Sequence, residues 1–134
     1  MYLVIWVAFI QILFILVSPL SDALNLPVHV VIALVILGLT FTIYRNVSRT
    51  SCPDRIKRIT RTTWYLAILQ GALGVLLALG VVLSFGSVYI GVMSLLHVGN
   101  ALAIITQASS SATAYDMWEE NEFVSSPSQP SSLR

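Results

Sequence analysis

The sequence predicts an all-α integral membrane protein, built as an antiparallel up-down four-helix bundle. Apolar residues make up 57% of the 134 residues and charged residues only 10%, whereas soluble domains are about 45–50% apolar and about 25% charged. Several long stretches carry no charge and approach the roughly 20 residues that cross a membrane as a helix. The connections between them are short, which makes neighbouring helices antiparallel. This composition excludes a disordered chain, a coiled coil and a soluble nucleic-acid-binding protein.

Membrane spans are predicted in chain order at residues 2–20, 23–44, 63–85 and 88–113, which together make residues 1–114 one transmembrane bundle. The spans are helical because lipid cannot satisfy the open edges of isolated strands. The first is interpreted as a span and not as a secretory signal, since no basic segment precedes it and no convincing cleavage site follows. The second is expected to start with Asn25 as its cap and Pro27 in its first turn.

The few charges predict the topology. Of the seven basic residues, six fall within one short segment, namely Arg45, Arg49, Arg55, Lys57, Arg58 and Arg61. Cytoplasmic loops carry the excess of Lys and Arg, so the 45–62 loop is expected in the cytoplasm. Both termini then lie there too, in a multi-pass protein of the cell membrane. Topology alone accounts for these charges, and binding of anionic membrane lipids or of a partner is the alternative.

The last part of the chain, residues 115–134, is predicted to be a cytoplasmic tail. Its first half is acidic and contains Asp116, Glu119, Glu120 and Glu122. Its second half is rich in Ser and Pro, a composition typical of disorder. The single Cys52 excludes a disulfide within one chain.

The candidate functional residues are His29 and His97, the two ionisable residues inside the predicted spans. Ionisable residues within a membrane are costly and mark functional sites. Both lie on helices that begin outside, so they share a leaflet, at about 6 Å and about 15 Å below their expected helix starts. Two neutral imidazoles on two helices suit the two axial positions of haem iron. Hydrogen-bonded contacts between helices are the alternative role for these histidines.

Small residues accompany the two histidines. Ala33 follows His29 by one helical turn, and Ala101 follows His97 by one turn. The third span adds small residues at helical spacing, namely Gly71, Gly74 and Ala78. These positions leave room for a flat macrocycle, although such stripes also mark close helix packing.

Further polar side chains lie within the spans. Ser94 and Asn100 flank His97 by about one turn and are expected to orient its second ring nitrogen. Gln11 and Gln70 are expected to hydrogen-bond across helices. No carboxylate or thiol accompanies the histidines in the spans, which argues against zinc and di-metal sites.

With these residues in place, the chain resembles one repeat of the heme A synthase family, the membrane proteins of cytochrome oxidase assembly. His29 lies in LPVHVVIALVILGL, His97 lies in VMSLLHVGNALAII, and LQGALGVLLALGVV resembles the third-helix pattern of the family. The resemblance covers roughly residues 1–114. It implies haem held by His29 and His97, in a compact form that works as a homodimer or within a larger respiratory or assembly complex.

The resemblance also implies an activity, the oxidation of haem O to haem A. The catalytic half of the family has Glu one turn before its second-helix histidine, where this chain has Leu26, so the chain is more similar to the half that holds haem b. Whether it is an enzyme therefore stays open. A non-enzymatic b-type cytochrome, or a small subunit of a membrane oxidoreductase, is the alternative. A structural subunit without a cofactor is a third function that fits the apolar helices.

Overall fold

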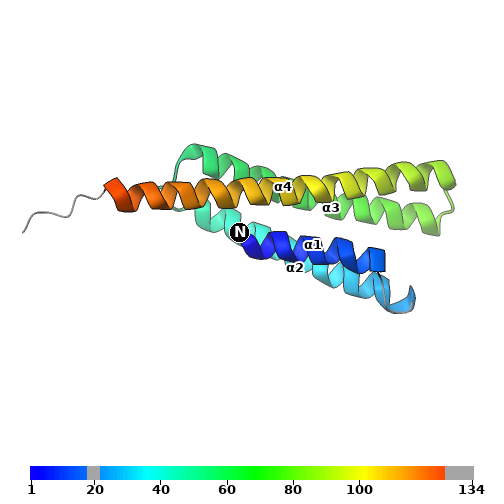
Figure 1. Ribbon diagram of the computed structural model, residues 1–134. Coiled ribbons are helices and arrows are strands. Elements are labelled where there is room, and N and C mark those ends of the chain that lie inside the picture. Colours follow the sequence, from blue (N-terminus) through cyan, green and yellow to red (C-terminus); the bar gives the residue numbers. More distant parts are fainter. Residues whose placement is uncertain (18–21, 126–134) are drawn as a thin grey trace, which may run out of the picture.

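The protein is a bundle of four α-helices in a computed structural model. The structure describes the backbone of residues 1–17 and 22–125 and the side chains of residues 1–14 and 24–121. The helices are α1 (Tyr2–Val17), α2 (Asp22–Ser48), α3 (Asp54–Val82) and α4 (Ser87–Ser125) (Figure 1). Each packs against two others: α1 and α3 both contact α2 and α4. Among the described helices, α2 and α4 have no such contact and lie diagonally across the bundle. The predicted all-α membrane bundle is confirmed.

Three of the described helices, α2, α3 and α4, are each long and apolar enough to cross a bilayer. The described part of helix α1 has 16 residues, and at about 1.5 Å per residue this part is shorter than a hydrocarbon core of about 30 Å. The end of the predicted first span, residues 18–20, lies outside the described residues. Large apolar side chains such as Trp6, Val82 and Leu95 are exposed on the outer surface, as lipid contact requires.

The basic segment is largely helical, which differs from the predicted 45–62 loop. Helix α2 continues to Ser48 and α3 begins at Asp54, so the connection comprises only residues 49–53. Arg45 therefore lies in the last turn of α2, and Arg55 lies in the first turn of α3. The composition located the charges correctly but gave no signal for the helix ends, because Arg and Lys are good helix formers.

The acidic segment is also helical. Helix α4 continues without a break through residues 114–125. Its aromatic residues Tyr115 and Trp118 pack on a buried cluster of Val47, Cys52 and Ile56 beside the 49–53 connection. The hydroxyl of Tyr2 donates a hydrogen bond to the Asp116 carboxylate, which ties the start of α1 to α4. The rest of the predicted tail, residues 126–134, lies outside the described residues.

The start of α2 corrects one prediction. The helix begins at Asp22, so Asn25 lies inside the first turn and is not its cap, and Pro27 lies within the helix. Proline has no backbone N–H to donate, so the carbonyl of Ala23, four residues earlier, loses its helical donor. The helix tolerates this single loss within its first two turns. The Asn-Leu-Pro sequence is therefore compatible with an earlier start than the capping rule indicated.

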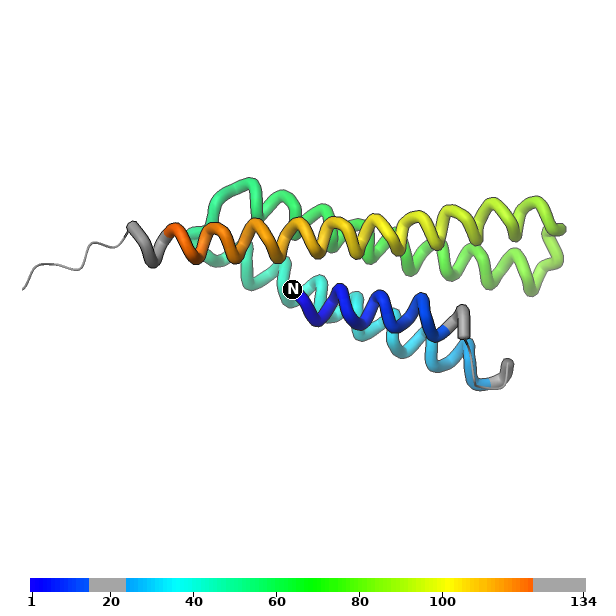
Figure 2. Tube along the Cα trace, viewed as in Figure 1, coloured from blue at the N-terminus to red at the C-terminus, as the bar shows by residue number. Residues whose placement is uncertain are grey.

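Packing is tightest toward the 49–53 connection. The main buried cluster joins all four helices through Val4, Ala8, Ile36, Ala67, Ile104 and Ala108. Toward the opposite end, the α1–α2 hairpin diverges from the α3–α4 hairpin (Figure 2). Residues 81–88, at the end of the α3–α4 hairpin, are all exposed. Between the tight core and the open end lies the layer that contains the histidines.

The open end of the α3–α4 hairpin is fixed by local contacts. At the end of α3, the N–H of Phe85 bonds to the Gly80 carbonyl at 3.0 Å and the N–H of Ser84 to the Val81 carbonyl at 3.2 Å. This is the Schellman arrangement, with Ser84 at a φ of 56°. The Tyr89 ring lies on Gly80, and its hydroxyl donates to the Leu76 carbonyl at 3.1 Å. Glycine is needed at position 80 because this ring fills the space of a side chain.

We expect Gly80→Ala to destabilise the protein, because a Cβ at this position would lie 2.1 Å from Cε1 of Tyr89. Overpacking of this kind costs about 1–3 kcal/mol of unfolding free energy. Gly71→Ala is the matched control, since a Cβ there meets nothing within 4 Å. Thermal unfolding in detergent, followed by circular dichroism, measures both. Equal midpoints for the two variants would contradict the close approach at Gly80.

Candidate functional site

The two histidines meet inside the bundle. The ring centroids of His29 and His97 lie 6.1 Å apart, with the ring planes at 48°. His29 comes from α2 and His97 from α4, the two diagonal helices, and both side chains are partly buried. Helices on a diagonal have no backbone contact, so only inward-pointing side chains can bring them together. The sequence predicted a shared leaflet, and the structure adds direct proximity.

The helix starts are staggered in a way that allows this proximity. His29 lies seven residues after the first residue of α2, and His97 lies ten residues after the first residue of α4. At about 1.5 Å per residue, the two depths differ by about 5 Å. Because α2 begins earlier than predicted, the mismatch is about half of the one expected from the sequence.

Gln11 of α1 is the nearest polar neighbour of His29. Its Nε2 lies 3.0 Å from Nδ1 and 3.3 Å from Nε2 of the ring, and it donates to the His29 carbonyl at 3.3 Å. Gln11 is buried at 8% exposure. The cross-helix bond predicted for this residue is confirmed, and the histidine as its partner is new. An amide facing His29 controls which ring nitrogen carries the proton.

Gly74 of α3 lies against the ring of His97. A Cβ at Gly74 would come within 3.3 Å of Cε1 and 3.8 Å of Nδ1 of that ring. Of the other small residues, Ala33 and Ala101 are partly buried, whereas Ala78 is exposed. Gly71 borders open space. Gly74 is therefore the small residue that makes room for a histidine, and spacing alone did not distinguish it from Gly71.

The residues expected to orient His97 have other contacts. Asn100 donates to the Leu66 carbonyl at 2.9 Å and to Oε1 of Gln70 at 2.7 Å. The cross-helix bond predicted for Gln70 is thus confirmed, with Asn100 as its partner. The expectation that Ser94 or Asn100 bonds to the second ring nitrogen is wrong, because the buried Nδ1 of His97 has no hydrogen-bond partner. Asn100 lies nearly one turn past His97, on the side that faces α3.

Two buried polar atoms in this layer lack partners among the described residues, Oε1 of Gln11 and Nδ1 of His97. Leaving such an atom unpaired costs about 1–3 kcal/mol. In the described part of the chain, no group of three or more metal-ligating side chains occurs. The site therefore offers two imidazoles and an amide, a donor set too small for a structural zinc ion. Two imidazoles could hold a metal ion only where its other ligands come from outside the described residues.

Comparisons with known proteins leave the family open: no family model matches the sequence, and neither a curated protein nor a solved structure matches it significantly.

The proximity of positions 29 and 97 is testable without any cofactor. In a Cys52→Ala background, we expect His29→Cys combined with His97→Cys to be joined by a short thiol-specific cross-linker. His29→Cys combined with Leu95→Cys is the control, since Leu95 is 74% exposed on the outer surface. Protease digestion and mass spectrometry detect the cross-linked peptides. Cross-linking of the control pair at the same rate would mean that the rings do not face one another.

Proposed function

We propose that this chain is a haem-binding membrane protein, with one haem, of b-type when it is a resident cofactor, held between His29 and His97. The observation that carries the proposal is the separation of 6.1 Å between the ring centroids of two histidines on diagonal helices. Each metal–imidazole bond is about 2 Å long and the ligating nitrogen lies roughly 1 Å from its ring centre, which places two axial imidazoles about 6 Å apart. The haem itself supplies the four remaining nitrogen ligands.

Two features of the neighbouring residues support this ligand pair. Rotation of the Gln11 amide about its last side-chain bond exchanges its oxygen and nitrogen. In that orientation Oε1, which otherwise has no partner, would accept a hydrogen from Nδ1 of His29 at the 3.0 Å position, and the longer bond from Nε2 to the His29 carbonyl would be lost. Nε2 of His29 is then free to bind a metal, with Gln11 as its positioning residue. On the other side, Gly74 leaves the space that the His97 ring occupies.

The surroundings of the histidines suit a macrocycle. The α1–α2 and α3–α4 hairpins diverge toward this end of the bundle (Figure 1), so a flat group meets less tightly packed helices there than near the main buried cluster. Ala33 and Ala101, one turn from each histidine, are partly buried and carry only a methyl group. Haem supplies the redox chemistry, while these residues bind it, orient it and keep water from it.

Two reactions are compatible with such a site. The resemblance to heme A synthases favours oxidation of haem O to haem A, with haem as substrate. Ligation by both His29 and His97 would favour electron transfer, because the iron would then have no coordination position left for oxygen. Leu26 is apolar and exposed, so this position provides no proton acceptor one turn before His29. We therefore favour a haem-holding function first, with the oxidation as the second candidate.

A membrane location with both termini and the basic segment in the cytoplasm belongs to this proposal. It rests on six basic residues gathered at one end of the chain's second and third helices. A homodimer would supply the second bundle that tandem members of the resembled family have in one chain. A larger respiratory or assembly complex would do the same with another subunit.

We expect the purified protein, expressed with sufficient haem, to show a Soret band and the reduced spectrum of a six-coordinate haem. His29→Ala and His97→Ala should each lower the haem content at least about tenfold, since one remaining ligand holds the iron weakly. Thr106→Ala is the control, because this exposed residue of α4 bonds only to its own helix. Absorption spectra and pyridine extraction measure haem per protein.

Imidazole rescue separates ligation from a structural role. His97→Gly should regain the six-coordinate spectrum when imidazole is added, because the free ring occupies the vacated space. A wild-type protein that folds, as judged by its helicity, and carries no Soret band would overturn haem binding. Unchanged spectra in both histidine variants would overturn these ligands.

The reaction is tested by expression together with a haem O source, followed by pigment extraction. Haem A in the extract, lost in His29→Ala, would support the oxidation. We expect haem O without haem A from a haem-loaded protein that is supplied with an electron donor, which would favour the cytochrome.

A further inference from the structure

We propose that the cytoplasmic end of the bundle binds the phosphate headgroup of an anionic phospholipid, in a basic pocket between α2 and α3. This inference is independent of the haem proposal, because the pocket lies at the 49–53 end of the helices. Membrane topology needs only an excess of positive charge in this segment. The proposal goes further, because it gives the cations of α3 a specific ligand.

The pocket is formed by the end of α2 and the first turns of α3. Its open volume is about 460 Å³, and it is lined by Tyr44, Ser48, Asp54, Arg55, Lys57, Arg58 and Arg61. Arg55, Arg58 and Arg61 follow one another at intervals of three residues and so form a row along one side of α3. Lys57 adds a fourth cation from the same turns.

The charge of the pocket is uncompensated. Four cations and the single carboxylate of Asp54 give the lining a net charge of +3. Within the part of the chain whose side chains are described, no carboxylate lies at ion-pair distance from any of these cations. Like charges held this close repel one another, so an anion that enters the pocket lowers the free energy of the whole row.

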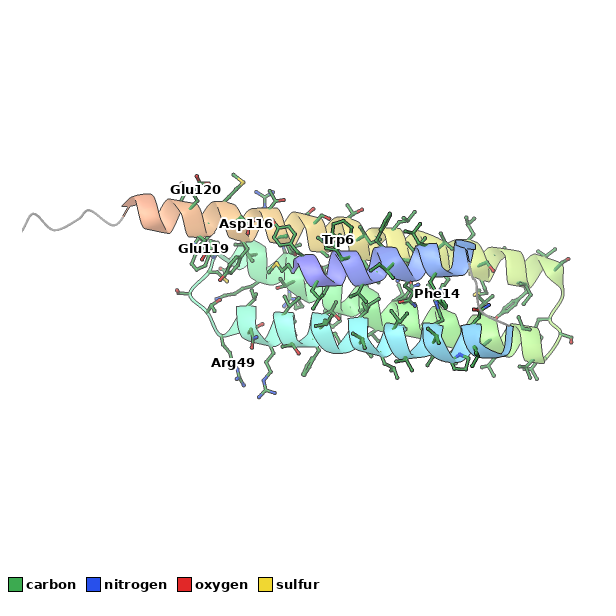
Figure 3. All side chains as sticks on the ribbon, turned by 60° about the horizontal axis from the view of Figure 1, so that its bottom comes forward. Trp6, Phe14, Arg49, Asp116, Glu119 and Glu120 are labelled. Carbon is green, nitrogen blue, oxygen red and sulfur yellow. The ribbon has the colours of Figure 1, made fainter. Side chains whose placement is uncertain are left out.

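The described acidic side chains of α4, those of Asp116, Glu119 and Glu120, do not line the pocket. Asp116 accepts the hydrogen bond of Tyr2 from α1. In Figure 3, Asp116, Glu119 and Glu120 lie on the α4 side of the bundle, away from Arg49 at the end of α2. The cations of the pocket are therefore left for a ligand from outside the described chain.

The position of the pocket favours a lipid over a soluble anion. Uncharged stretches begin directly beyond it, before Tyr44 on α2 and after Arg61 on α3, so the pocket lies at the level where headgroups meet apolar helices. Just inward, the rings of Phe41 and Trp64 lie 5.1 Å apart across the same two helices. A phosphate in the pocket would place its acyl chains along this apolar surface. One guanidinium group can bind two phosphate oxygens at once, and three arginines line the pocket.

The test is native mass spectrometry of the full chain in a non-ionic detergent, titrated with phosphatidylglycerol or phosphatidylcholine. In detergent the diffuse surface potential of a bilayer is absent, so a bound lipid reports the pocket. We expect one phosphatidylglycerol molecule to be retained in preference to phosphatidylcholine. Arg58→Gln with Arg61→Gln should weaken its binding at least about tenfold, since each cation near a lipid headgroup contributes about fivefold.

Arg45→Gln with Arg49→Gln is the matched control, because it removes two charges of the same segment that do not line the pocket. We expect its affinity to stay within about threefold of the wild type. A second pair, Arg55→Gln with Lys57→Gln, should behave like the first pocket pair. Helicity of all variants, measured by circular dichroism, shows that they fold.

Three outcomes would overturn the proposal. Equal losses in the pocket and control pairs would mean that the segment attracts anions without a site. Equal retention of the two lipids would remove the role of charge. Displacement of the lipid by millimolar glycerol 3-phosphate would identify a soluble phosphate as the ligand.

Discussion

The amide side chains of Gln11, Gln70 and Asn100 find partners on other helices, because lipid offers none and an unpaired polar group is costly. That constraint organises the middle of the molecule. Gln11 reaches from α1 to His29 on α2, and Asn100 reaches from α4 to Gln70 on α3. Each bond joins the two helices of one hairpin. In this middle layer, the contact of His29 with His97 crosses from one hairpin to the other, as the hydrogen bond from Tyr2 to Asp116 does nearer the 49–53 end. The cofactor proposal follows from this arrangement.

The two ends of the bundle differ in how closely their helices pack. Toward the 49–53 connection, α4 packs its aromatic residues on Val47, Cys52 and Ile56, and the main apolar cluster lies next to it. Rigid packing at this end holds the cationic row of α3 in register with α2. Toward the other end the hairpins separate, and the histidines lie before that opening. The proposed haem would require this division, since native packing density leaves no room for a flat ligand.

Much of the fold was predictable from the distribution of charged residues along the sequence. The absence of charge over long stretches predicted the spans, and three of the described helices are long and apolar enough to cross a membrane. The helices continue beyond the predicted spans at residues 44, 63 and 113, because hydropathy marks where charge begins and not where a helix stops. Residues such as Arg58 and Glu119 are compatible with a helix that continues beyond the membrane. The capping signal at Asn25 predicted the wrong start for α2. The helix begins three residues earlier, at Asp22.

The sequence by itself determined the membrane class, the helical bundle and the identity of its two embedded histidines, because burial in lipid restricts composition so strongly. Only the tertiary structure decided which polar residues meet. Gln11 and His29 are 18 residues apart and His97 lies on a third helix, so their proximity depends on helix rotation and stagger. Gly74 and Gly71 are alike in sequence, yet only Gly74 touches a histidine. Rotation and stagger are set by packing of whole helix faces, which no local pattern encodes.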